Sequence, residues 1–479
     1  MYDLIIRGGT VVDGSGAPRF RADVAIQDGR IAAIGPDLPV AARRVIDARD
    51  RIVAPGFIDC HTHDDTAVTS LSHMLPKLLQ GVTTVIAGNC GIGAAPFTRA
   101  VVPPPLDLLD RRQIDTRSFA GFVDEVERQG LQVNIAYLAG LTTIRAEVMD
   151  DTGRAATADE IARMRALLAD ALQAGAIGAS VGTYYPPARA ADVDEVVAVC
   201  ADLDPARHLI TAHLRDEGDK VLESMEEAVT MAGRLEVPLV ISHHKLLGVA
   251  NHGRSAETLA RLDEYARLQP VCMDCYPYAA SSTMLDPAKA DAATSVQVAW
   301  STPYPEHAGH DLDEVAAQWR CTRAEAAVRL APGGAIYFSM SMDDVRAILS
   351  HPLTMVGSDG LPHDACPHPR LWGSFPRVLG RLVREERWLS LEAAVHKMTG
   401  LPARRFALQG RGALVVGACA DLVVFDEHRV LDVASYASPR QAPCGIDWVV
   451  LNGQVKVEAE EVAVAACGQL IRRAPGVAS

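Results

Sequence analysis

Apolar strand-like runs alternate with helix-like segments from residue 56 to about residue 410. The alternation is clearest in VTTVIAG, ADEIARMRALLADALQAG, AIGASVG, ESMEEAVTMAGRLEV and PLVISHH, in that order. This order is typical of parallel strands joined by crossover helices. Open doubly wound sheets and closed (β/α)8 barrels share the pattern, but polar residues recur at the ends of at least five of the runs. Functional residues that come from many strand ends favour the α/β barrel.

The two ends of the chain have a different pattern. Residues 1–55 alternate apolar and polar positions between Gly-rich turns, and the same texture returns after about residue 413. A period of two is typical of β-strands. We therefore expect residues 1–55 and 413–479 to form one small β domain, a sandwich or barrel, with residues 56–412 as the (β/α)8 barrel. The length of 479 residues suits a barrel of about 250 residues with a smaller companion.

The alternation is interrupted between residues 279 and 337. This segment contains SSTMLDPAKADAAT, a Pro-containing stretch and a helix-like run over residues 313–331. Long excursions of this kind are often functional. We expect residues 279–337 to be inserted over the barrel mouth as a substrate lid; the alternative is a solvated excursion with no role.

Two histidines follow the first strand-like run of the barrel. In GFIDCHTHDD, His61 and His63 stand two residues apart, so both imidazoles leave the same face and can bind one ion. Cys90 stands at the polar end of the next run, VTTVIAGNCGIG, beside a glycine that lets the backbone approach a ligand. Taken singly, these residues could equally be packed in the core, as most free cysteines are.

Further polar residues end the later runs. His213 ends HLITAH, and His243 ends PLVISH about one βα unit later. His244 follows directly; because adjacent strand residues face opposite sides, at most one of the two meets a metal, and the spacing does not say which. Asp359, in MVGSDG, is a metal ligand, a proton shuttle or a helix cap. Zn²⁺ accepts all these ligand types, and their joint occurrence at five strand ends predicts a zinc site.

These motifs resemble those of a known family. HTH after GFID, ADLVVFD near the end and the order of the later ligands resemble the amidohydrolase superfamily. Within it, HTHDD, GVTTVIAGNCGI, AHLRDEG, VISHHK, GSDGLPHD and PHPRLWGSFPRVLG resemble the N-acyl-D-amino-acid deacylases, or D-aminoacylases. The resemblance runs essentially end to end. It implies a metal-bearing (β/α)8 barrel with a small β domain from both chain ends, and hydrolysis of N-acyl-D-amino acids to a carboxylate and a free D-amino acid.

The resemblance also implies roles for the candidate residues. It implies that a tightly bound zinc is held by Cys90, His213 and His243. A second zinc, weaker or partly occupied, would be held by His61 and His63. Many relatives bridge their metals with a carboxylated lysine, and the resemblance implies that Cys90 takes this role here. Of the adjacent His243 and His244, it implies that His243 is the metal ligand. Metal-bound hydroxide would be the nucleophile, with Asp359 as general base and acid. One departure is that relatives often have a histidine in a GHxxLR motif, which residues 140–145 lack.

An N-acyl amino acid carries an α-carboxylate, which an acidic protein must hold with a placed cation. Arg370, in PHPRLWG, is the first candidate and Lys245, two residues beyond a candidate ligand, is the second. Tyr185, Tyr276 and Ser282 resemble positions that line the family's substrate pocket and offer hydroxyl donors. The alternative is that these tyrosines, which stand beside prolines, are packing residues.

The side chain of the substrate is less constrained. Residues 290–300 hold no cation, which favours a neutral residue such as D-Met or D-Leu. A deacylase selective for N-acyl-D-glutamate or N-acyl-D-aspartate is the alternative. A cyclic-amide hydrolase of the hydantoinase or dihydroorotase type would need a bridging lysine, which we do not find. A deaminase is a second alternative function. A third is a metal-free scaffold that has lost catalysis, but such a loss normally removes metal ligands, and here every candidate ligand is present.

Charge and cysteine usage limit the partners and the compartment. The formal net charge of −14 argues against nucleic acid and anionic membrane surfaces. There is no basic leader before an apolar run and no uncharged apolar run of about 18 residues, so we expect a cytoplasmic protein. Its ten cysteines lack regular short spacings, so reduced thiols are expected, with Cys272 and Cys275 as structural residues. The sequence does not indicate an oligomeric state.

Overall fold

Parallel strands surround the centre of this computed structural model, which describes residues 1–39, 41–110 and 116–473. The strands pair in two runs, β6–β7–β8 and β9–β10–β11–β12–β13–β17, with one residue between β8 and β9. A parallel bridge between Thr62 and Gly360 joins the ends of β6 and β17 and closes the ring. The strands are β6 Phe57–Asp59, β7 Val82–Ala87, β8 Asn134–Tyr137, β9 Ala139–Gly140, β10 Gly178–Gly182, β11 Leu209–His213, β12 Leu239–Ile241, β13 Val271–Cys275 and β17 Thr354–Val356. The predicted (β/α)8 barrel is confirmed.

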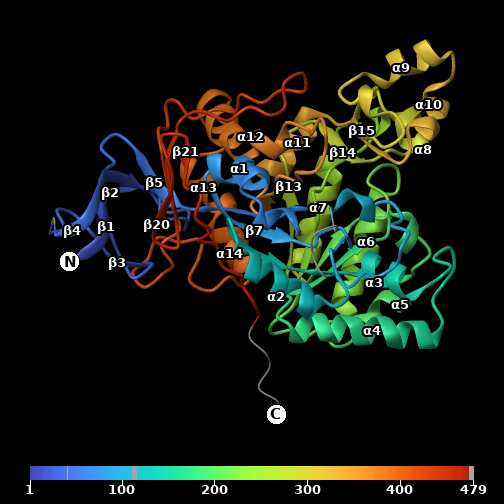
Figure 1. Ribbon diagram of the computed structural model, residues 1–479, viewed down its shortest axis with the longest axis horizontal. Helices are drawn as coiled ribbons and strands as arrows, with labels where there is room; N and C mark the ends of the chain where they lie inside the picture. Colours follow the sequence, from blue (N-terminus) through green and yellow to red (C-terminus); the bar gives the residue numbers. More distant parts are fainter. Residues whose placement is uncertain (40, 111–115, 474–479) are drawn as a thin grey trace.

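Helices connect the barrel strands and lie outside them (Figure 1). Strands such as β7 are buried at every position, as parallel strands covered on both faces must be. The longest helix, α4, begins at a capping box in which Thr157 and Glu160 satisfy the first free N–H groups. The helices are α1 Leu71–Leu79, α2 Phe119–Gln129, α3 Leu141–Val148, α4 Ala158–Gln173, α5 Val193–Val199, α6 Val221–Arg234, α7 Ser255–Ala266, α11 Met342–Ser350, α12 Arg370–Arg377, α13 Leu391–Met398 and α14 Gly400–Arg405.

Strands from both ends of the chain form one further sheet, at the left of Figure 1. The two ends meet where β18 pairs antiparallel with β5, Leu422 opposite Pro55 and Phe425 opposite Ile52. The strands are β1 Tyr2–Val11, β2 Phe20–Gln27, β3 Arg30–Gly35, β4 Ala42–Asp47, β5 Ile52–Pro55, β18 Leu422–Phe425, β19 Ile446–Leu451, β20 Gln454–Glu458 and β21 Glu461–Val462. The small β domain predicted from both ends is thus present, while its limits at residues 55 and 413 stay predictions.

A small antiparallel sheet with three helices lies between β13 and α11. It consists of β14 Ala280–Met284, α8 Pro287–Ala292, β15 Ser295–Ser301, α9 Leu312–Trp319, α10 Arg323–Leu330 and β16 Gly333–Phe338. The helix-like run predicted over residues 313–331 is helical, but it forms two helices, α9 and α10, separated by residues 320–322. Arg320 adopts a left-handed conformation that ends α9, and Thr322 with Glu325 forms a capping box that starts α10. That residues 279–337 act as a lid stays a prediction.

Two expectations about the rest of the chain concern membranes and thiols. No helix in the described ranges has the length and apolar character needed to cross a bilayer. The ten cysteines, all within those ranges, are free thiols. Cys272 and Cys275 are buried in β13, as predicted for structural residues.

Candidate metal centre

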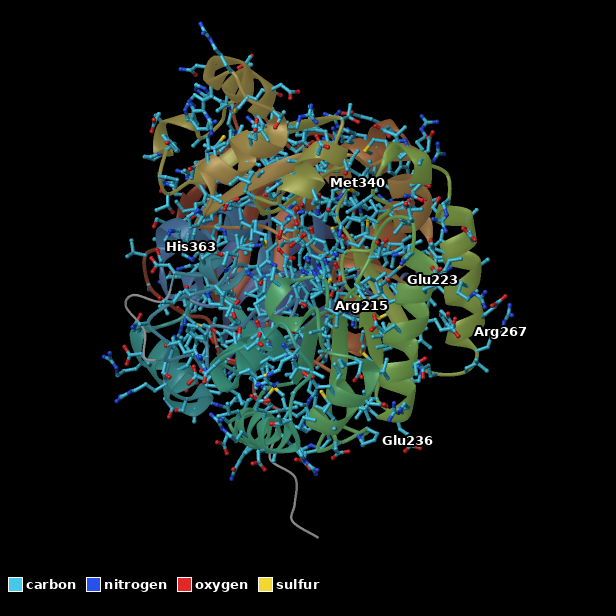
Figure 2. The ribbon with its side chains drawn as sticks, turned by 90° about the vertical axis from the view of Figure 1, so that its right-hand side faces the viewer. Arg215, Glu223, Glu236, Arg267, Met340 and His363 are labelled. Carbon is cyan, nitrogen blue, oxygen red and sulfur yellow. The ribbon has the colours of Figure 1, made fainter. Side chains whose placement is uncertain are left out.

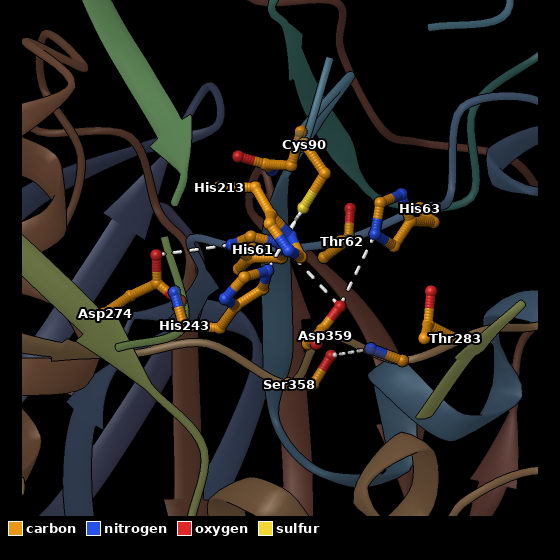
Figure 3. A network of polar contacts seen from close by, with 12 residues as sticks. His61, Thr62, His63, Cys90, His213, His243, Asp274, Thr283, Ser358 and Asp359 are labelled. Carbon is orange, nitrogen blue, oxygen red and sulfur yellow. Dashed lines mark hydrogen bonds and ion pairs between the residues drawn. The ribbon is translucent and has the colours of Figure 1, made fainter. Parts of the chain in front are cut away.

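Every predicted ligand and the predicted proton shuttle meet at one end of the barrel (Figure 3). Parallel strands bring their carboxyl ends to a common rim, and each of these side chains leaves a strand there. The residues are His61 and His63 after β6, Cys90 after β7, His213 at the end of β11, His243 after β12 and Asp359 after β17. Each is at most 6% exposed. The structure therefore assembles a closed, buried centre from five strand ends.

Cys90 lies between imidazoles from two other strands. Its Sγ is 3.3 Å from Nε2 of His61 and 3.2 Å from Nε2 of His243. The ring of His213 packs edge-on against that of His243, with 4.5 Å between the centroids. Burial alone would raise the pKa of the Cys90 thiol, but His243 and His61 hold that pKa well below its usual range. The lowered pKa favours the thiolate, the form that binds a metal.

Asp359 faces His63 and also His61, the imidazole that it shares with Cys90. Its Oδ1 is 3.4 Å from Nε2 of His63 and 3.7 Å from Nε2 of His61, while its Oδ2 is 2.9 Å from Nη1 of Arg370. Burial alone would raise the pKa of Asp359, but Arg370 and His63 hold it well below its usual range. The carboxylate is therefore ionised and can serve as a metal ligand or accept a proton.

The donor set fits zinc. Neither ring nitrogen of His213 has a hydrogen-bond partner among the described residues, and the same is true of Nδ1 of His63. Buried polar atoms without partners are rare, and an ion is one of the groups that can complete them. One thiolate, four imidazoles and a carboxylate are all ligands that Zn²⁺ takes. The division into a tight trio and a weaker pair stays a prediction, because Nε2 of His61 approaches both Cys90 and Asp359.

Three residues of the centre have a left-handed backbone. The φ angle is +57° at Cys90, +36° at His243 and +50° at Asp359. Residues other than glycine rarely adopt such angles, which cost about 1–3 kcal/mol each. All three stand where the chain turns away from a strand end, so backbone strain is concentrated at the residues that aim donors into the centre.

Two carboxylates that the sequence analysis missed hold the ligands in place. Asp274 Oδ2 is 3.2 Å from Nδ1 of His61, and its Oδ1 accepts a hydrogen bond from the backbone N–H of His243. Glu217 Oε1 is 3.1 Å from Nδ1 of His243 and 2.5 Å from Nζ of Lys245. A carboxylate on the far nitrogen of a ligating imidazole fixes its tautomer and orientation. The signals were present: Asp274 lies at a strand end in VCMDC, and Glu217 follows His213 by four residues.

The predicted substrate-binding residues surround the same centre. Arg370 is fully buried, with its guanidinium 4.5 Å from the ring of Tyr276 and Nη2 donating to the carbonyl oxygen of Ser282. The ring of Tyr185 lies 4.9 Å from that of His213. Lys245 is paired with Glu217, so its charge is already compensated. Nε of Arg370 and Oγ of Ser282 have no hydrogen-bond partner among the described residues, which leaves them available to a ligand.

Two cavities lie near the centre, beside residues labelled in Figure 2. One, of about 580 Å³, is lined by Arg215 and Glu223 and also by Tyr184. The ring of Tyr184 stacks on that of His213, 5.4 Å away, so this tyrosine separates the cavity from the centre. The other, of about 770 Å³, is lined by His363 in the segment that follows Asp359.

A (β/α)8 barrel with thiolate, imidazole and carboxylate donors at its carboxyl rim defines a metal-dependent hydrolase. Residues 44–204 and 322–457 match the Amidohydrolase family. An N-acyl-D-aspartate deacylase from Alcaligenes xylosoxydans xylosoxydans is 49% identical over 99% of this chain and 95% of its own. The chain belongs to the amidohydrolase family and, within it, to the N-acyl-D-amino-acid deacylases, as predicted.

Two solved structures are similar over almost the whole chain. One is a D-aminoacylase with a binuclear metal centre, in which one metal activates the enzyme and the second attenuates it. Its sequence is 45% identical, the match covers 99% of this chain and 100% of the other chain, and the TM-score is 0.97. The other is an N-acyl-D-glutamate deacylase from Bordetella bronchiseptica, with zinc and a phosphonate mimic of the tetrahedral intermediate. Its sequence is 43% identical, the match covers 98% of this chain and 99% of the other chain, and the TM-score is 0.95.

The protonation of the centre predicts an order in which metal is lost as the pH falls. In the metal-free centre burial lowers the pKa of His63, but Asp359 and Cys90 raise it to about 9, so a proton competes with a metal at His63 below that pH. Burial lowers the pKa of His213, and the pKa of Cys90 is also low, so both stay deprotonated at a lower pH. Despite burial, Cys90 and Glu217 raise the pKa of His243, so a proton competes at one ligand of this trio, whereas the pKa values of both His61 and His63 are raised. A metal that uses His63 should therefore dissociate first on acidification.

Zinc content measured after equilibration between about pH 8 and pH 5 checks this order. We expect the second equivalent to be lost before the first, and His63→Asn to remove the second equivalent at every pH. Loss of both equivalents in one step in the wild-type protein would contradict it.

Proposed function

We propose that this protein is a zinc-dependent enzyme that hydrolyses the amide bond of N-acyl-D-amino acids to a carboxylate and a free D-amino acid. The observation that carries the proposal is the arrangement of donors at the rim, with Cys90 Sγ within 3.3 Å of Nε2 of His61 and 3.2 Å of Nε2 of His243, and with Asp359 beside His63. Zinc bound at this centre would polarise the scissile carbonyl and acidify the attacking water. The preference for D-substrates is supported by the names of the similar deacylases.

Arg370 is the residue that we propose for the α-carboxylate. Its planar guanidinium matches a carboxylate, and its Nε has no hydrogen-bond partner among the residues that the structure describes. The Oγ of Ser282 offers a second donor beside it, since Arg370 already touches the carbonyl oxygen of that residue. Tyr276 stacks under the guanidinium and fixes its plane. A carboxylate held here places the neighbouring amide next to Asp359, which contacts the same arginine.

Asp359 is the residue that we propose for proton transfer. It accepts the proton of the attacking water and returns it to the leaving nitrogen, because an amide nitrogen is too basic to leave unprotonated. Arg370 lowers the basicity of this carboxylate in the free protein. A substrate carboxylate on Arg370 competes with that ion pair and so makes Asp359 a better base once substrate is bound.

Asp359→Asn tests this role. It should lower kcat by at least about 100-fold, since general acid–base catalysis contributes about 10²–10⁴-fold. Zinc at Cys90, His213 and His243 should remain, as measured by metal analysis. The control is Asp344→Asn, which alters a buried carboxylate that accepts from the backbone N–H groups of Gly253 and Ser255 and should leave kcat unchanged. Wild-type turnover in Asp359→Asn would refute the role.

Lys289 supports a finer proposal, that the substrate carries an acidic side chain. It stands one residue before the segment 290–300, which itself holds no cation. Its Nζ lies 5.4 Å from the ring centroid of Tyr184 and 5.1 Å from that of Tyr337. Within the described ranges no carboxylate oxygen lies within 4.0 Å of this Nζ. Burial lowers the pKa of Lys289 to about 8, so the ammonium remains mostly charged at neutral pH.

The position of Lys289 suits the far end of a substrate. Tyr184, which its Nζ faces, stacks on the candidate zinc ligand His213, so the lysine stands one aromatic ring away from the centre. A cation at that distance, without a carboxylate partner in the described part of the chain, complements a D-aspartyl or D-glutamyl side chain. We therefore favour N-acyl-D-aspartate or N-acyl-D-glutamate over neutral substrates.

Lys289→Met should raise KM for N-acetyl-D-aspartate or N-acetyl-D-glutamate by about tenfold or more, because a hydrogen bond to a charged group contributes about 1.5–3 kcal/mol. The KM for N-acetyl-D-methionine should stay the same or fall. Lys220→Met, at an exposed lysine in the wall of the cavity beside Arg215, is the matched control. An unchanged ratio of acidic to neutral substrates in Lys289→Met would overturn the acidic preference.

We also propose that the protein acts in the cytoplasm on this small-molecule substrate. The ten free cysteines support a reducing compartment. The net charge of −14 supports the absence of nucleic-acid partners.

A further inference from the structure

Lys77 is a charged residue that the proposed mechanism does not use. It lies in α1 and is fully buried, directly behind the strand ends that carry the centre. Its Nζ is 2.6 Å from Oδ2 of Asp59, 3.3 Å from Oδ2 of Asp64 and 2.8 Å from Oγ of Ser358. Burial would lower the pKa of Lys77, but Asp59 and Asp64 raise it, so the ammonium stays charged.

These contacts join the first and last strands of the barrel. Asp59 is the last residue of β6, two residues before His61, and Ser358 directly precedes Asp359. Asp59 Oδ1 also accepts a hydrogen bond of 2.8 Å from the backbone N–H of Ser358. Lys77 and Asp59 thus bind each other and both bind Ser358, which makes a closed triangle of contacts beneath the centre.

The seam between β6 and β17 has little backbone support of its own. Both strands are three residues long, and in the described part of the chain the strand pairing between them consists of the bridge from Thr62 to Gly360. One further hydrogen bond, from the N–H of Asp359 to the carbonyl oxygen of His61, crosses it. The two neighbouring seams have longer ladders, because β6 and β7 pair over three positions and so do β13 and β17. Side-chain contacts must therefore fix this seam.

We propose that Lys77 is a positioning residue that fixes the distance between Asp359 and the pair His61 and His63. It acts through Ser358 on one side of the seam and through Asp59 on the other. Cys90, His213 and His243 come from other strands and do not depend on it. This inference rests on the proposed function, since it concerns the residues proposed for the second metal and for proton transfer.

The test compares Lys77→Met with the wild-type protein in two measurements. Calorimetric titration of the metal-depleted full chain with zinc should show one tight equivalent retained and the second bound about 10- to 100-fold more weakly, the usual effect of losing a group that orients ligands. Hydrolysis of N-acetyl-D-aspartate should show kcat reduced by about 100-fold, the effect of displacing a catalytic group by about 1 Å, with KM changed less than about threefold.

Lys397→Met is the matched control. Lys397 is also a buried lysine, in α13, and its Nζ donates to the carbonyl oxygens of His351 and Thr354 at the opposite end of β17. Its loss should reduce the melting temperature while leaving kcat and both zinc affinities close to wild type. A role of Lys77 in stability alone would make the two variants alike.

Ser358→Ala serves where Lys77→Met does not fold. It removes the hydroxyl that accepts from Lys77 and leaves the ion pair with Asp59 in place. We expect kcat to fall by about tenfold with the tight zinc retained. The inference is overturned if the second zinc binds with wild-type affinity and kcat falls no further than in Lys397→Met. If the wild-type protein hydrolyses none of the substrates, the proposed function fails, and the zinc titration still decides the role of Lys77.

Discussion

A buried thiolate surrounded by imidazoles is the interaction on which the rest of this structure depends. Cys90 is 1% exposed, and a charge so far from water is tolerated only beside opposite charge or hydrogen-bond donors. His61 and His243 supply both. The barrel makes this possible because its parallel strands deliver side chains that are 29 and 153 residues from Cys90 in sequence to one rim.

Charge compensation continues outward from the thiolate in layers. Asp274 and Glu217 hold the far nitrogens of His61 and His243, and Lys245 balances Glu217 in turn. Arg370 balances Asp359 on the side where a substrate carboxylate would bind. Each layer fixes the orientation of the one inside it, and the left-handed backbone at Cys90 and Asp359 adds strain that the surrounding contacts must hold.

The sequence was sufficient for the barrel and for the inner layer of the centre, because both follow from local pattern. A strand-like run ending in a polar residue predicts a rim position, and this located Cys90 and His213 without any knowledge of contacts. The outer layer could not be found in this way. Lys77 meets Ser358 across 281 residues, and only the folded chain shows that pairing. Lys289 lies one residue before the segment 290–300, so the lack of a cation within that segment gave no sign of it. The break between α9 and α10 depends on a left-handed Arg320 that helix propensity does not reveal.

The central claim is that zinc at the Cys90 centre hydrolyses N-acyl-D-amino acids. The most direct measurement starts from metal-depleted protein, adds zinc in stoichiometric steps and follows hydrolysis of paired N-acetyl-D- and N-acetyl-L-aspartate. Activity on the D-enantiomer should appear with the first equivalent, while the L-enantiomer stays intact. Equal turnover of the two enantiomers, or no hydrolysis with zinc bound, would contradict the account.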